Sequence, residues 1–224
     1  MDEPYPYLLA VSDEPLRTLN TAPFGGGFGQ CRLLVNRQVG ITYDHADPNA
    51  EMEAFLRRQR LEPEATACLM TAARVGDAAV ASAVCGAARV TSLVTVGLGN
   101  KARAGLALPA PQLYPGTINT IVLVGGAMTD AAMAGAVLTA TEAKAAALQA
   151  LDERVAAPSC APEVPAAYAT GTTTDAVLIA AVGHGPLHRY AGTATEVGYL
   201  IGRTVYDAVV ESGRRYQAYR AAKA

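Results

Sequence analysis

Two largely apolar segments constrain the fold of this chain more than any other feature. The first is the run Ile118–Val124, and the second is a predicted strand at Thr172–Val182 that is apolar after Asp175; glycine follows each of them directly. A run of this length without alternation predicts a central strand that is buried on both faces. Each strand must therefore lie inside a layered structure, with other elements packed against both of its sides.

A long helix is predicted after each run, at about residues 129–154 and 193–218. The first is rich in Ala, Leu and Met, which are strong helix formers, and Thr129 suits its N-cap position. The tetrapeptide Thr-Ala-Thr-Glu also occurs twice, at 139–142 and 193–196. The repeated order of elements allows an internal strand–loop–helix duplication, although the tetrapeptide could recur by chance in a chain so rich in Ala and Thr.

Each long helix carries a ridge of small residues. The first has alanines at 136, 140, 143 and 147, and the second has Ala194, Gly198 and Gly202. A glycine inside a helix costs about 1 kcal/mol relative to alanine. Two glycines at this spacing therefore indicate that another backbone comes close, and we expect the two helices to pack against each other or against one sheet.

Shorter elements complete the predicted layout. They are extended pieces within 7–19 around a turn at 13–15, strands at 32–35 and 39–43 with a turn at 36–38, helices at 47–60 and 63–74, and a strand hairpin at 78–84 and 89–97. Strands paired locally, with helices kept apart from them, favour the α+β class. We expect one domain over 1–224, with a mostly antiparallel or mixed central sheet and helices on its faces.

The composition excludes several classes of protein. The net charge is −2 and no basic stripe with interleaved aromatics occurs, so no nucleic-acid partner is expected. The first residues lack the pattern of a signal peptide, and no run is long enough to span a bilayer, so a cytoplasmic protein is expected. A homo-oligomer is left open, because the sequence does not show the oligomeric state.

The sequence offers little support for a metal site or for disulfide bonds. Four cysteines occur without a C-x-x-C spacing, so buried free thiols are expected. His184 and His188 are four residues apart, but the glycines and the proline around them forbid a helix. No metal site is therefore predicted.

Polar residues gather in a few segments of this chain of low charge. Thr193-x-x-Glu196 matches a capping box at the start of the last helix, which gives Glu196 a structural explanation. Glu142 falls in mid-helix, where every backbone N–H is already bonded and a capping box has no role. It is therefore either an exposed charge, together with Lys144, or a carboxylate that faces a cleft.

The segment 170–175, Thr-Gly-Thr-Thr-Thr-Asp, stands where the second apolar run begins. Alternate threonines point to one face of a strand, so Thr172 and Thr174 can present their hydroxyls together. Asp175 leads into apolar residues, and a buried carboxylate without a partner costs several kcal/mol. It must therefore be bonded or used.

The glycines at 25–29 form a further candidate site. No G-K-[ST] follows them, and the surrounding strand and helix pattern does not fit a dinucleotide-binding turn. They are either a tight flexible loop or a place where the backbone approaches a flat ligand.

Several of these segments, in fixed order, resemble the adenosylcobinamide amidohydrolases (CbiZ family). The resembling segments are Met70–Ala73, Thr95–Asn100, Gly116–Asn119, Thr139–Lys144, Ala169–Asp175 and Tyr190–Glu196, continuing through Gly198 and Gly202. The resemblance covers about residues 18–210. It implies hydrolysis of the amide that joins the corrin propionate to aminopropanol, which yields adenosylcobyric acid and 1-amino-2-propanol for corrinoid salvage. Cobalt would enter only with the substrate, and no cofactor is expected.

Amide hydrolysis requires a nucleophile, a base and donors for the oxyanion. A threonine hydroxyl or a water could attack, Asp175, Glu142 or Glu196 could act as the base, and Lys144 or Asn119 could polarise the carbonyl. The candidate catalytic residues are Asp175, Glu142, Thr173, Glu196 and Lys144. The candidate substrate-binding residues are Gly26, Gly27, Asn36, Asn100, Thr117, Asn119, Gly171, Thr172, Thr174, Gly192 and Thr193.

Two alternatives stay open at this point. A corrinoid carrier or sensor with the same pocket would bind without turnover. A threonine-nucleophile hydrolase could cleave its own chain before a threonine within 172–174.

Overall fold

A computed structural model describes residues 5–106, 117–155 and 166–223. The main elements of the described chain are β1 (Tyr7–Asn20), β2 (Gly27–Gln38), α1 (Pro48–Arg58), β3 (Thr66–Thr71), β4 (Ala79–Cys85), β5 (Ala88–Val96), β7 (Ile118–Gly125), α2 (Asp130–Ala150), β12 (Ala176–Val182) and α3 (Glu196–Ala221). Short pieces lie between them: the 3₁₀ turns η1 (Pro63–Ala65) and η2 (Val75–Asp77), and strands β6 (Lys101–Ala102), β8 (Ala127–Met128), β9 (Arg154–Val155), β10 (Ala167–Tyr168), β11 (Gly171–Thr172) and β13 (Leu187–His188).

Seven strands form one mixed sheet in the order β3-β2-β1-β12-β7-β5-β4. The pairs β2–β3 and β7–β12 are parallel, and the other neighbouring pairs are antiparallel. The α+β class and the mixed sheet predicted from the sequence are therefore confirmed. The order strand, short strand, long helix does occur twice, but the structure does not show a duplication.

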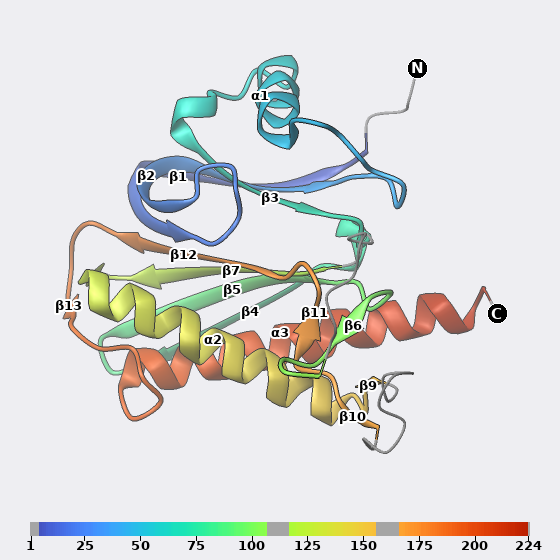
Figure 1. The fold of residues 1–224 in the computed structure, drawn as a ribbon. Helices are drawn as coiled ribbons and strands as arrows, with labels where there is room; N and C mark the ends of the chain where they lie inside the picture. Colours follow the sequence, from blue (N-terminus) through green and yellow to red (C-terminus); the bar gives the residue numbers. More distant parts are fainter. Residues whose placement is uncertain (1–4, 107–116, 156–165, 224) are drawn as a thin grey trace.

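The sheet curls over itself, so that the molecule has four layers (Figure 1). Helix α1 covers β1–β3, which lie over β12, β7, β5 and β4, and α2 and α3 cover the far side. Three separate apolar clusters fill the three spaces between these layers. A register shift between Val11 and Leu16 interrupts the β1–β2 ladder, and such a bulge increases the local twist of a strand pair.

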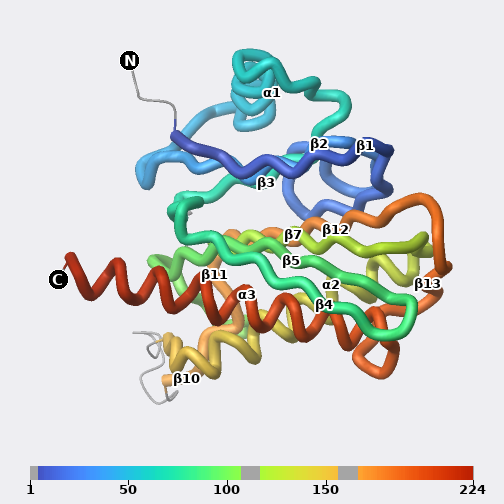
Figure 2. Tube along the Cα trace, turned by 180° about the vertical axis from the view of Figure 1, so that it is seen from behind, coloured from blue at the N-terminus to red at the C-terminus, as the bar shows by residue number. Residues whose placement is uncertain are grey.

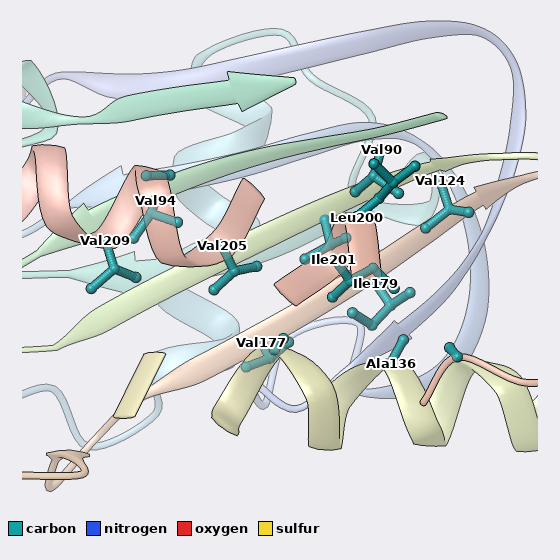
Figure 3. Packing of buried hydrophobic residues seen from close by; sticks show 14 of the residues in the cluster. Val90, Val94, Val124, Ala136, Val177, Ile179, Leu200, Ile201, Val205 and Val209 are labelled. Atoms are coloured by element: carbon teal, nitrogen blue, oxygen red, sulfur yellow. The ribbon is translucent and has the colours of Figure 1, made fainter. Parts of the chain in front are cut away.

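The largest cluster lies between the sheet and the two long helices. Figure 3 shows the valines of β5 and β7 together with Ile179 of β12, facing Leu200, Ile201 and Val205 of α3. Helices α2 and α3 contact each other, as the small residues predicted. The close approach at Gly198 has another cause, since a Cβ there would overlap the carbonyl oxygens of Ala191 and Gly192 in the preceding loop.

Two predictions about the first third of the chain are wrong. The segment 63–74 is not a helix, because only a 3₁₀ turn precedes strand β3. The apolar residues of β3 lie between α1 and the second β layer, and this burial outweighs their helix propensity. The turn expected at 36–38 and the strand at 39–43 are also absent, since β2 continues to Gln38.

The predicted hairpin at 78–97 is confirmed as β4 and β5. Its two-residue turn begins at Gly86, whose φ of +56° lies in the left-handed region that such turns require. No helix within the described ranges is both long and apolar enough to cross a membrane.

Candidate active site

A cavity of about 490 Å³ opens between the two β layers, at the end where β7 and β12 begin. One wall, called the polar wall below, comes from the start of these parallel strands and from the end of β3. Its opposite wall comes from the segment after β1, the loop after β2, and α1. The lining residues are Thr21–Phe24, Val39, Tyr43, Pro48, Met52, Cys68, Met70–Ala72, Thr117 and Thr173–Ala176.

Asp175 is the centre of the polar wall. Its Oδ1 accepts hydrogen bonds from the Ile118 amide at 3.0 Å and from the Thr172 hydroxyl at 2.5 Å. Its Oδ2 accepts from the Thr172 amide at 3.0 Å and from the Lys144 ammonium. The carboxylate therefore ties the 172–175 loop to β7 and to helix α2. The prediction that Asp175 must be bonded is confirmed.

Lys144 and Asp175 form a nearly buried ion pair, with side-chain exposures of 8% and 12%. Gly171 makes room for this pair, because a Cβ at this position would overlap Asp175 Oδ2 and would lie 2.8 Å from Lys144 Nζ. The sequence left Glu142 and Lys144 as exposed charges on different sides of the helix, or Glu142 as a carboxylate that faces a cleft. In the structure Glu142 is exposed, whereas Lys144 is buried and turns inward to the loop.

The threonines around Asp175 differ in their surroundings. Thr173 is exposed, and its hydroxyl accepts a hydrogen bond of 2.6 Å from Asn100 Nδ2. Thr117 is buried and donates to the carbonyl of Thr174 at 2.6 Å. Thr172 is half-buried and donates to Asp175. Eight of the predicted site residues thus meet at one loop, namely Asn100, Thr117, Lys144, Gly171, Thr172, Thr173, Thr174 and Asp175.

Asn36 and Asn119 connect the two β layers below the cavity. Asn119 Nδ2 donates to Asn36 Oδ1 at 2.8 Å and to the Met70 carbonyl at 2.9 Å. Asn36 Nδ2 donates in turn to the Thr95 hydroxyl at 2.9 Å. Both amides are fully buried. Since both Nδ2 hydrogens of Asn119 bond to the protein, its amide holds the layers together and does not face a substrate carbonyl in this structure.

The opposite wall carries a second polar group. Arg37 and Glu51 form two short hydrogen bonds, 2.5 and 2.8 Å, and the hydroxyl of Tyr43 donates to Glu51 at 3.2 Å. Bonding to Arg37 holds the pKa of Glu51 below its ordinary value. Burial and the Glu51 charge raise the pKa of Tyr43 to about 12. Tyr43 is therefore a neutral hydrogen-bonding group at the edge of the cavity.

Cys68 also lines the cavity, but it is a poor nucleophile. Burial raises the pKa of this thiol to about 12, so the thiolate is scarce at neutral pH. Cys31 is likewise a buried free thiol. The expectation of free buried thiols is confirmed for these two residues, whereas Cys85 is half-buried and Cys160 lies outside the described residues.

The C-terminal group of predicted residues lies at the other end of the sheet. Gly192 and Thr193 are exposed. Thr195, and not Thr193, caps α3, since its hydroxyl accepts from the Gly198 amide at 3.0 Å. The capping box expected at 193–196 is therefore wrong by two positions. Glu196 is exposed, and its carboxylate lies beside the Gly86 turn.

The glycine loop adjoins the cavity but does not line it. Gly26 and Gly27 are exposed, whereas Phe24 just before them is a lining residue. Gly27 has a φ of +79°, and a Cβ at Gly26 would lie 2.5 Å from the Ala22 carbonyl oxygen. The tight turn thus explains these glycines without a ligand. Gly26, together with Gly25 and Gly29, borders a separate hollow of about 300 Å³.

Comparison with known families gives one match. The family model for adenosylcobinamide amidohydrolase covers residues 2–221 of the 224. The chain belongs to this family. A search of the curated proteins finds no match. As a member, the chain is an amidohydrolase that acts on adenosylcobinamide.

Several cavity residues of this amidohydrolase were missed from the sequence. Tyr43 and Met52 line the cavity, and Glu51 lies behind Tyr43; they come from a loop and a helix that reach the cavity only because one β layer folds over the other. The sequence did offer one signal, since Asp47-Pro48 begins a helix with Glu51 in its first turn. Among the described residues, no group of three or more His, Cys, Asp or Glu side chains is placed to hold a metal ion.

Proposed function

We propose that this amidohydrolase releases 1-amino-2-propanol and adenosylcobyric acid from adenosylcobinamide, in salvage of incomplete corrinoids in the cytoplasm. The match over nearly the whole chain supports the substrate. The carboxylate Asp175, set on the wall of a cavity, is the observation that carries the assignment of the site.

The cavity suits one arm of the substrate. Its volume of about 490 Å³ lies within the range of about 300–1,000 Å³ for sites of drug-sized ligands. A whole corrinoid is larger than such ligands. We therefore place the propionamide arm inside, with the macrocycle at the mouth, against the side chains of Phe24 and Pro48.

The hydroxyl of Thr172 is the proposed nucleophile. It donates to Asp175 at 2.5 Å, and Lys144 holds the same carboxylate from the other oxygen. A nucleophile bonded to a base, with the base held by a third group, is the arrangement that nucleophilic catalysis requires. Thr172 immediately precedes the lining residues Thr173–Asp175.

The reaction then takes two steps. The Thr172 oxygen attacks the amide carbon as its proton passes to Asp175. The C–N bond breaks as that proton moves to the leaving nitrogen, which releases 1-amino-2-propanol and leaves an ester on Thr172. Water, deprotonated by Asp175, attacks the ester, and the proton returns to the threonine oxygen as adenosylcobyric acid leaves. The proposal needs no resident metal, because cobalt belongs to the substrate.

Release of aminopropanol from adenosylcobinamide, followed by mass spectrometry, tests the function. Thr172→Ser should keep turnover, whereas Thr172→Val should lose it while the protein still binds the corrinoid. Equal activity of Thr172→Val and the parent would exclude the threonine as nucleophile and favour direct attack by water. Loss of turnover after chelation of metal ions would contradict the metal-free reaction.

Self-cleavage of the chain is not part of the proposed route. Thr172 acts through its hydroxyl within the chain, so the purified active protein should have the intact mass. Two fragments divided before residue 172, 173 or 174 would instead favour a self-processing hydrolase.

A further inference from the structure

Strand β4 is an open edge of the sheet. Among the described strands it pairs with β5 alone. Its sequence, Ala-Val-Ala-Ser-Ala-Val-Cys, contains no charge and no proline. Proteins normally protect an edge strand with such residues or by covering it, because free backbone groups bind other strands. The opposite edge, β3, has five buried positions out of six and contacts β7 through the Met70 carbonyl.

The two faces of β4 are unlike each other. Ala79, Ala81, Ala83 and Cys85 pack toward α3 within the main apolar cluster. Val80 and Val84 point the other way and are 63% and 62% exposed. Ser82 lies between them. Two apolar side chains thus lie exposed on a strand with one free edge, a combination that indicates a protein interface.

The strand is nearly symmetric about Ser82. In an antiparallel pair of β4 strands centred on this residue, Val80 faces Val84 of a second copy, and Ala81 faces Ala83 of that copy. A twofold dimer requires this kind of self-complementary surface. We propose that two copies of this chain pair through β4, so that one sheet continues across both.

The helix beside β4 is compatible with this pairing. Helix α3 packs over β4 and β5 and runs antiparallel to β4, since Glu196 lies at the Gly86 turn and Arg215 donates to the carbonyl of Ala78 (Figure 2). Strands lie about 4.8 Å apart, so the two α3 axes would be roughly 10 Å apart, which is a normal packing distance between helices.

Charges on α3 also match across the proposed axis. The antiparallel arrangement brings Glu196 of one copy toward Arg215 of the other. Arg203 and Asp207, which form an ion pair within the helix, lie near the axis and can exchange partners there. Opposite charges therefore meet opposite charges at both places, which favours a second copy over an unrelated strand as the occupant.

Sedimentation velocity of the full chain tests the dimer. The parent should sediment as a dimer, and Val80→Lys, which places a cation in the interface, should sediment as a monomer. Leu138→Lys is the matched control, because Leu138 is similarly exposed but lies on helix α2 and not on an edge strand. A monomeric parent at every concentration, or a dimer unaffected by Val80→Lys, would overturn the proposal.

A crosslink tests the register. In a pair centred on Ser82, the two Ser82 Cα atoms lie about 4.5–5.5 Å apart, within the range of a disulfide. In a background with Cys85 and Cys160 replaced by alanine, Ser82→Cys should form a covalent dimer on oxidation. Thr91→Cys, opposite Ser82 on the inner strand β5, should not. Crosslinking of both variants alike, or of neither, would reject this register. Amide hydrolysis per chain should be unchanged in all these variants, so this proposal can fail independently of the proposed function.

Discussion

The two ends of the parallel strands β7 and β12 carry similar residues in different surroundings. At the end where the strands begin, Thr172 and Asp175 share a buried network with Lys144. At the other end, Thr195 caps helix α3, and Glu196, the first residue of that helix, is exposed to solvent. Both sets combine threonine, glycine and a carboxylate, and both belong to segments that resemble the same family.

Burial makes the difference between the two ends. The carboxylate of Asp175 is largely buried, so it needs hydrogen bonds from the protein in place of water. It accepts four, and these fix the loop that faces the cavity. Glu196 remains hydrated and imposes no such order. A polar motif therefore indicates a site only when its charged group is buried and must be neutralised by neighbouring groups. The following predictions test that rule.

The largest difference should come from one methyl group placed at each end. Gly171→Ala drives a Cβ into the Lys144–Asp175 pair, whereas Gly192→Ala meets open space. A displacement of about 1 Å in an active site can cost about 100-fold in rate. We expect at least that loss of amidase activity for the first variant and none for the second. Equal activities would show that the ion pair does not position the catalytic loop.

Removal of a buried charge should have a much larger effect on stability than removal of an exposed charge on the same helix. Lys144→Met leaves Asp175 buried without its cation, which should destabilise the fold by about 3–5 kcal/mol. Glu142→Gln, two residues away and exposed, should be nearly neutral. Urea denaturation measures both. In Lys144→Met/Asp175→Asn, part of the lost stability should return, since no uncompensated charge remains. A double variant less stable than Lys144→Met would contradict this account.

At the solvent-facing end, the expected effect is smaller. Thr195→Ala removes the hydroxyl that accepts from the Gly198 amide, and loss of an N-cap costs about 1 kcal/mol. For a chain of this size that corresponds to a fall in Tm of about 2–4 °C. Thr193→Ala should leave Tm unchanged. A larger effect at Thr193 would restore the capping box that the sequence suggested.

The smallest effect concerns the far wall of the cavity. The pKa of Glu51 is lowered in the folded chain, so its stabilising contribution is present above the ordinary value of 4.5 and is lost as the pH falls. The difference in stability between the parent and Glu51→Gln should therefore be greatest near neutral pH and shrink below about pH 4.5. Urea titrations between pH 7 and 4 measure it. In an Arg37→Met background the difference should largely disappear, and a difference that grows with acid would be opposite in sign.

Sequence reasoning succeeded where one element determines its own environment. The segments at 118–124 and 172–182 yielded the central strands β7 and β12, although β12 begins only at Ala176 and residues 173–175 form a turn. Asp175 was singled out as a carboxylate that needs a partner. Sequence reasoning failed where the conformation of a segment depends on contacts with a layer that is distant in the sequence. Asn36 favours a turn by itself, yet it lies inside β2 because Asn119 and Thr95 on the other layer bond to it. Strand β3 likewise depends on a parallel partner and on burial on both sides.

The pairing of β1 with β12 also governs how the chain reaches its fold. Leu16 pairs with Val182, so this ladder cannot close until most of the polypeptide has been synthesised. The β1–β2 hairpin can form early, but Leu34 and Leu69 on its layer lack their cover until β7 and β12 arrive. Contacts of such long range slow folding and prolong the exposure of apolar surface. Refolding from denaturant should therefore compete with aggregation, and its yield should fall as the protein concentration rises.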